Sequence, residues 1–147
     1  MRVNEKDEFS TYFRAIQIRF SRFYARFLTQ ADLTLQQYAL LNQLASSGTM
    51  SMTDASEKLH ISKPAVTHLV DRLEKSKLLR RAPHPNDRRV YLLEIQPKGK
   101  KIARKIQAHV LQYLLKTLNK FTASERRTII KFYALMARSM DEILEKP

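Results

Sequence analysis

The first part of the chain carries a single apolar stripe at helical spacing. Large apolar residues recur there in steps of three and four, at Phe9, Phe13, Ile16, Phe20, Phe23 and Phe27. Such steps keep side chains on one side of an α-helix. Arginines occupy the other sides of the same stretch, at Arg14, Arg19, Arg22 and Arg26. The pattern predicts a long amphipathic helix near the start of the chain.

A second, shorter helix is predicted over residues 34–46. Thr34 is a favourable N-cap, and Gly48 lies just beyond the last apolar residue, where helices commonly end. The inward side of this helix is expected to hold Leu35, Tyr38, Leu41 and Ala45. The helix therefore begins and ends sharply.

Two further helices follow with a very short turn between them. Ser51 and Asp54 form a capping pair for a helix that ends near His60. Ser62 is a good N-cap for the next helix. Pro64 fits the first turn of that helix, where a missing N–H costs nothing. The expected buried residues are Met52, Ala55 and Leu59 in the first, and Val66, Leu69, Val70 and Leu73 in the second. The pattern predicts a helix-turn-helix.

Segments suited to β-strands come next. Leu78–Ala82 and Val90–Ile95 flank residues 83–89, a stretch rich in turn formers. We predict a two-stranded hairpin with a long basic tip. A tight helix pair followed by a small hairpin is typical of a winged helix-turn-helix, in which the second helix enters the major groove of DNA.

The last part of the chain returns to the helical period. Apolar residues recur from Pro97 to Leu118, and Thr122 with Glu125 matches the capping box of a final helix. The fold class is therefore mainly α, with about six helices and a two-stranded β-hairpin wing. The long terminal helices offer more apolar surface than one short domain can cover, which predicts a homodimer.

The charge of the chain indicates its partner. The 27 Lys and Arg residues against 14 Asp and Glu give a formal net charge of +13 over 147 residues. Thirteen of these cations but only four of the acids lie between Ser62 and Lys105, a surplus of nine positive charges within and just after the predicted winged helix. A polyanion is the expected partner, and double-stranded DNA is the leading candidate.

Rare residue types exclude several classes of site. The chain has no cysteine, which excludes disulfides and thiolate sites, and its two glycines are too few for a phosphate-cradling loop. Its histidines are too widely spaced for a metal set, so we expect no metal and no cofactor. We expect a cytoplasmic protein without a membrane partner, since no apolar run approaches roughly 20 residues and no secretory signal is recognisable. An enzyme would need a convergent acid–base pair or an activated nucleophile, and the residue spacing suggests neither, so we do not expect an enzyme.

The outer face of the predicted helix over residues 62–75 supplies candidate DNA contacts. Thr67 and His68 lie one turn past the helix start and are expected to hydrogen-bond base edges, while the Ser62 cap faces a phosphate. Arg72 and Lys75 are expected to hold phosphates. The full set is Ser62, Lys63, Pro64, Thr67, His68, Arg72 and Lys75. The alternative is that these are ordinary solvated helix residues.

The hairpin tip supplies a second set of candidates. Asp87 lies two residues before Arg89, so its carboxylate can pair with that guanidinium and present it to a narrow minor groove. Arg88 is expected to point elsewhere, toward phosphate. The alternative is an exposed ion pair worth less than about 1 kcal/mol in a flexible loop. Spacing alone does not decide between the two.

The residues of this region resemble the winged helix of the MarR family of bacterial transcription regulators. The resemblance rests on the runs Ser51–Leu59, Ser62–Thr67, Asp71–Glu74 and Asp87–Val90, and the flanking helices agree in length and order. It implies a homodimer whose first and last two helices interlock. It also implies that Arg89 enters the minor groove and that Asp87 positions it.

The same resemblance implies an organisation along the chain. From its length we expect residues 1–147 to form a single domain, and the resemblance places the winged helix over 34–96 and the dimerisation helices over 1–33 and 97–147. Two positions depart from the family pattern: Ser76-Lys77 stands where the family usually has glycine, and Gln96-Pro97 where it usually has threonine. Neither departure threatens the fold, but the local turn geometry stays open.

Regulators of this kind often respond to small molecules, and the resemblance implies a pocket for an aromatic or phenolic anion. Aromatic residues could line it and an arginine of the first helix could neutralise the ligand. The candidates are Phe13, Arg14, Phe20, Tyr24, Tyr38 and Tyr113. The competing interpretation, which we favour for any single residue, is that these side chains form the core and the dimer interface.

The function expected from the sequence is a homodimeric, sequence-specific DNA-binding regulator, most often a repressor, on a pseudo-palindromic operator. An alternative is a basic architectural or RNA-binding protein that recognises charge and shape alone. The two differ in a measurable way. A regulator prefers its operator over random duplex by about 10³-fold or more, whereas the alternative shows a steep salt dependence and little base preference.

Overall fold

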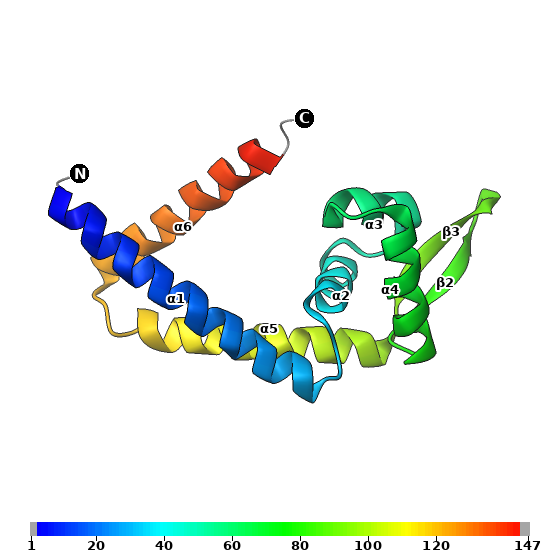
Figure 1. Cartoon of the computed structure of the whole chain (residues 1–147), viewed down its shortest axis with the longest axis horizontal. Coiled ribbons are helices and arrows are strands. Elements are labelled where there is room, and N and C mark those ends of the chain that lie inside the picture. Colours follow the sequence, from blue (N-terminus) through cyan, green and yellow to red (C-terminus); the bar gives the residue numbers. More distant parts are fainter. Residues whose placement is uncertain (1–2, 145–147) are drawn as a thin grey trace. The chain divides into compact units, whose positions relative to one another are not determined.

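The computed structural model describes the backbone of residues 3–144 and their side chains except at positions 88, 89 and 144 (Figure 1). It divides the chain into two compact units, residues 1–107 and 108–147. The helices are α1 (Val3–Gln30), α2 (Leu35–Ser47), α3 (Met52–Leu59), α4 (Lys63–Lys75), α5 (Pro97–Leu118) and α6 (Ala123–Leu144). The predicted mainly helical fold is confirmed, with six helices in residues 3–144.

The core of the first unit lies between α2, α4 and a small sheet. The side chains that are almost completely buried are Leu40, Leu41 and Leu44 of α2, Val66, Val70 and Leu73 of α4, and Leu79 and Leu93 of the sheet. The predicted inward face of α4 is therefore confirmed. The prediction for Leu35 is wrong, because this side chain is 61% exposed. Leu35 lies six residues before Leu41, about a third of a turn away around the helix axis.

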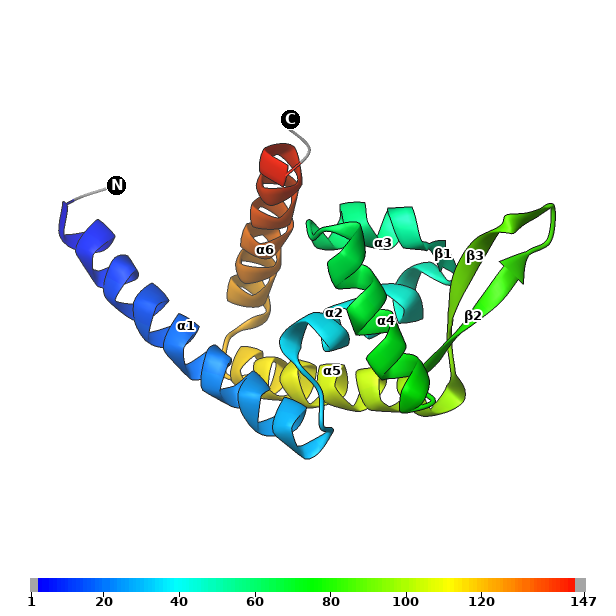
Figure 2. The same ribbon diagram turned by 45° about the vertical axis from the view of Figure 1, so that its right-hand side comes forward.

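The sheet has three strands, whereas the sequence predicted two. β2 (Leu79–His84) and β3 (Asp87–Ile95) form the wing hairpin, and β1 (Met50–Ser51) pairs antiparallel with β3 on its other side (Figure 2). Met50 is 4% exposed and lies opposite Leu93, which is completely buried. A two-residue strand has no period to detect. Its pairing comes from burial of Met50 just before α3 begins.

The wing tip is tighter than predicted. The expected long loop over residues 83–89 is wrong, because strand pairing continues to His84 and Asp87, which lie opposite each other. Pro85 and Asn86 alone form the turn, and the Asn86 N–H donates a hydrogen bond to His84 Nδ1 at 3.2 Å. The register is irregular just before the turn, because Pro83 lies opposite Tyr91 whereas His84 lies opposite Asp87. β2 is an edge strand, where proline is tolerated.

The second unit consists of the last part of α5 and α6. The Thr122 N–H and Oγ1 donate hydrogen bonds to Glu125 Oε2 at 2.8 and 2.7 Å, so the predicted start of the last helix is confirmed. Many large apolar side chains of this unit are exposed, and an apolar groove is lined by Leu111, Leu114, Leu115, Leu118, Ile129 and Tyr133. Within residues 3–144, no helix combines the length and apolar character needed to cross a membrane.

Candidate nucleic-acid interface

The helix-turn-helix is held by hydrogen bonds at each helix end. The Ser51 N–H donates to Asp54 Oδ2 at 2.9 Å and the Asp54 N–H to Ser51 Oγ at 3.1 Å, which caps α3. His60 ends α3 in the left-handed conformation, with φ of 50°. The Ser56 hydroxyl then donates to the Ile61 carbonyl at 2.6 Å. The Ile61 N–H donates in return to the Ser56 carbonyl at 3.2 Å, so both backbone and side-chain bonds close the short turn between α3 and α4.

The capping bonds also change the acidity of Asp54. The hydrogen bond from the Ser51 backbone N–H, together with the Ser51 side chain and the nearby charge of Lys58, lowers the pKa of Asp54 below its ordinary value. The carboxylate is therefore ionised near neutral pH, as a capping acceptor must be.

The start of α4 is organised as the sequence predicted. Ser62 is extended, with φ of −66° and ψ of 152°, and its hydroxyl oxygen accepts a hydrogen bond from the Ala65 N–H at 3.4 Å. Pro64 lies in the first turn, where no N–H partner is required. The positive end of the α4 dipole is therefore capped by a small polar side chain that leaves it open to an anion.

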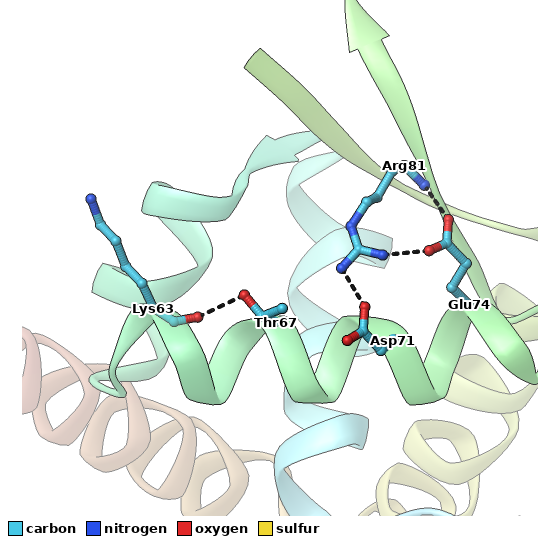
Figure 3. Close-up of polar contacts among 5 residues, drawn as sticks. All are labelled: Lys63, Thr67, Asp71, Glu74 and Arg81. Atoms are coloured by element: carbon cyan, nitrogen blue, oxygen red, sulfur yellow. Dashed lines mark hydrogen bonds and ion pairs between the residues drawn. The ribbon is translucent and has the colours of Figure 1, made fainter. Parts of the chain in front are cut away.

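The outer face of α4 is polar, cationic and open to solvent. All of the predicted contact residues of this helix and its cap are exposed, namely Ser62, Lys63, Pro64, Thr67, His68, Arg72 and Lys75. The Thr67 hydroxyl donates to the Lys63 carbonyl at 3.1 Å, which fixes its rotamer one turn from the helix start (Figure 3). Burial of the opposite face holds this polar face outward. Its contact with DNA stays a prediction.

An ion-pair cluster joins α4 to the wing and was not foreseen from the sequence. Arg81 of β2 donates from Nη2 to Asp71 Oδ1 at 2.6 Å and from Nη1 to Glu74 Oε2 at 2.5 Å (Figure 3). Its backbone N–H also donates to Glu74 Oε1 at 3.0 Å. The sequence pattern that could have indicated this cluster is the pair Asp71 and Glu74, two acids three residues apart on a helix in a strongly basic segment.

The acids also stabilise the charge of Arg81. Partial burial alone lowers the pKa of Arg81, but the hydrogen bonds and negative charges of Asp71 and Glu74 outweigh it and raise the pKa above its ordinary value. On the neighbouring position, Arg80 pairs with Glu94 directly across the hairpin at 2.6 Å. That second pair stays within the wing.

The wing tip is described in part. Asp87 is the first residue of β3 and is exposed, while the side chains of Arg88 and Arg89 lie outside the described residues. The predicted orientation of Arg89 by Asp87 therefore stays a prediction. The tight turn over Pro85 and Asn86 places these residues on strand backbone rather than in a long loop.

The candidate effector residues are spread over the chain. Phe13 and Arg14 are exposed on α1, Phe20 is half-buried, and Tyr113 lies in the second unit. Tyr24 and Tyr38 do meet, with ring centroids 6.0 Å apart. Burial, with a smaller effect from Tyr24, raises the pKa of the Tyr38 phenol. Within the described residues no cluster of metal-ligating side chains is found.

Comparison with known proteins identifies sequence relatives of this chain. The family model described as MarR family matches residues 31–90, which include the helix-turn-helix and most of the wing. An uncharacterised HTH-type transcriptional regulator of Bacillus subtilis, YsmB, is 31% identical over 98 residues, which cover 67% of each chain. Both of these matches are in sequence.

Solved structures show the same fold. A MarR family protein from Bacillus stearothermophilus superposes with a TM-score of 0.78 over 99% of both chains, at 22% identity. A MepR mutant from S. aureus bound to an oligodeoxyribonucleotide gives a TM-score of 0.69 over 90% of this chain and 97% of its own, at 21% identity. Together with the sequence matches, these findings show that the chain belongs to the MarR family of DNA-binding transcription regulators.

Proposed function

We propose that this protein is a homodimeric repressor that binds a pseudo-palindromic operator and occludes the promoter there. The observation that carries the proposal is the outer face of α4, which is exposed, cationic and held outward by a buried apolar face. A helix of this kind fits the major groove of B-form DNA. Two copies related by a two-fold axis then read half-sites about 10 base pairs apart.

The residues of α4 divide by role. Thr67 and His68 read base edges, because they lie one turn into the helix that enters the groove. The Ser62 cap and the helix N-terminus face one phosphate, and Arg72 and Lys75 hold others. Lys63 and Pro64 contact the backbone at the point of entry.

The wing contributes contacts at the edge of each half-site. Arg89 enters the minor groove with Asp87 as its orienting partner, and Arg88 binds phosphate. The position of these residues supports this role, since the two-residue turn leaves residues 87–89 on the strand that leads away from the wing tip.

A second copy of the chain covers the apolar surface that one copy leaves exposed. In α1, Phe9, Phe13 and Ile16 are each about half exposed, at 54%, 49% and 51%. In α6, Phe132 and Met140 are 48% and 54% exposed. Exposed apolar stripes of this length are unusual in monomers and mark interfaces. The dimerisation region accordingly comprises residues 1–33 and 97–147, around a winged helix over 34–96.

A small aromatic or phenolic anion releases the repressor. The support is the aromatic content of the first unit, where Tyr24 and Tyr38 pack together, and the arginines along α1. Addition of salicylate or benzoate is expected to weaken operator binding without dissociating the dimer. Unchanged operator affinity up to the solubility of both compounds would remove this part of the proposal.

Competition binding tests the DNA-reading function itself. A labelled duplex selected by the protein from a random library is competed against unselected duplex at fixed salt. We expect a preference of about 10³-fold or more. If both duplexes compete equally and the affinity depends steeply on salt, the result would instead support a basic architectural or RNA-binding protein.

A further inference from the structure

We propose that Arg81 is a positioning residue that locks the wing to α4, so that the two DNA-reading elements act as one rigid unit. The inference rests on the DNA-binding role of α4 and the wing. Its direct evidence is the set of three contacts that Arg81 makes with two side chains of α4 (Figure 3).

The geometry of the contacts is that of a clamp. Asp71 and Glu74 are three residues apart, so they lie on neighbouring turns of one helix face. The planar guanidinium spans both carboxylates, with N–O distances of 2.6 and 2.5 Å. The second oxygen of Glu74 accepts from the Arg81 backbone N–H, which ties the strand as well as the side chain. A charged fork held at three points restricts rotation of β2 about α4.

Arg81 lies at the base of the wing, where all three strands of the sheet are still paired. Arg81 lies opposite Leu93, and Leu93 lies opposite Met50, so all three strands are side by side at this level. β1 ends one residue later, at Ser51 opposite Leu92. Beyond this level the wing continues as two strands toward its tip. The clamp therefore holds the hairpin close to the point where it leaves the three-stranded sheet.

The clamp also adjusts the charge of the reading face. Asp71 and Glu74 are 55% and 38% exposed on a helix that approaches phosphates, and their charges alone oppose that approach. Arg81 is 25% exposed and neutralises one of the two negative charges. Positioning and neutralisation have separate readouts, because only positioning alters the geometry of the free protein.

The distance between α4 and the wing tip tests positioning without DNA. The chain contains no cysteine, so His68→Cys and Asn86→Cys give two unique spin-label sites, both exposed. Pulsed electron paramagnetic resonance on the spin-labelled double-cysteine protein, the parent for this measurement, is expected to show one narrow distribution of label-to-label distances. Arg81→Met, which keeps an unbranched apolar stem but removes the guanidinium, is expected to broaden it. Arg80→Met is the matched control, since Arg80 pairs only within the hairpin among its described ion pairs.

Operator discrimination is the second readout, measured on unlabelled proteins. Arg81→Met is expected to lower the ratio of selected-to-random duplex affinity by about tenfold, whereas Arg80→Met changes it less than about twofold. If Arg81→Met is not folded at the temperature of measurement, Glu74→Gln takes its place with the same expectations.

A distance distribution as narrow in Arg81→Met as in the parent would overturn the proposal, even if thermal stability falls. Such a result would leave Arg81 as a stabilising residue only. If the protein with its own sequence, without the cysteine substitutions, shows no base preference, the proposed DNA-reading function fails, but the distance measurement still decides the clamp. The two failures are therefore distinguishable.

Discussion

Lys77 determines how the chain leaves α4 and enters the wing. Its φ is 58°, in the left-handed region that side chains rarely adopt. The Lys77 N–H donates to the Glu74 carbonyl and the Leu78 N–H to the Leu73 carbonyl, both at 2.9 Å. These two bonds form a Schellman motif, in which this position usually holds glycine. The departure from the family's glycine therefore leaves the turn intact and places its conformational cost on Lys77.

Lys77→Gly is expected to stabilise the protein by about 0.5–1 kcal/mol. Removal of the side chain relieves a left-handed strain of about 1–2 kcal/mol, while the extra freedom of glycine in the unfolded chain offsets part of it. Urea unfolding of both proteins measures the difference. Ser76→Gly is the control, since Ser76 has φ of −82° and gains nothing from glycine. Equal stabilities of the two variants would contradict this explanation of the turn.

Lys75 and Arg89 are predicted to make different kinds of contact with DNA. Arg89→Ala is expected to weaken operator binding by about 1–3 kcal/mol without dissociating the dimer, because it loses a minor-groove contact. Lys75→Ala is expected to weaken all duplexes alike and to reduce the salt dependence by about one charge, because it loses a phosphate contact. Titration of selected and random duplexes at several salt concentrations separates the two. Unchanged operator affinity in Arg89→Ala would remove the wing from the mechanism.

Among the helices, α3 depends on its capping box. Ser51→Ala is expected to cost about 1 kcal/mol, since it removes the acceptor for the Asp54 N–H at 3.1 Å. Thermal unfolding at neutral pH measures this cost. Thr53→Ala is the control, because Thr53 is an exposed residue of the same helix. An equal effect of both substitutions would mean that the cap contributes nothing measurable.

The same cap predicts a pH dependence. The pKa of Asp54 is lower in the folded protein than its ordinary value of 3.8, so its stabilising contribution is complete above that value. The contribution is lost as pH falls through the lowered folded pKa. Asp54→Asn is therefore expected to be less stable near neutral pH and to lose less stability on acidification below about pH 4. Parallel stability curves for the two proteins over that range would contradict the capping role.

Elements with a local signal could be predicted from the sequence, and elements that depend on distant partners could not. The caps at Ser51, Ser62 and Thr122 and the apolar period of α4 each lie within a few residues, and the structure confirms them. β1 requires a partner far along the chain. The Arg81 clamp joins a strand to acids seven and ten residues earlier in a helix, so it does not follow from the periodicity of either element alone. The prediction of a long wing loop was wrong, because strand pairing extends through residues that favour turns.

At the level of the dimer, the exposed stripe of α1 makes a direct prediction. Ile16 is 51% exposed on a helix whose apolar residues recur along one side. Ile16→Asp is expected to weaken self-association by roughly 2 kcal/mol or more, because it places an unpaired charge in an apolar interface. Sedimentation across a concentration series measures the effect. Gln17→Asp adds the same charge one position away and is expected to leave the association nearly unchanged.

The proposed function requires two copies of the chain to act together on one operator. Selection of bound sequences from a random duplex library, followed by measurement of the mass bound to each selected duplex, tests this most directly. The predicted result is an inverted repeat with half-sites about 10 base pairs apart, occupied by two chains. Recovery of sequences without any shared motif, or of a single half-site occupied by one chain, would contradict it.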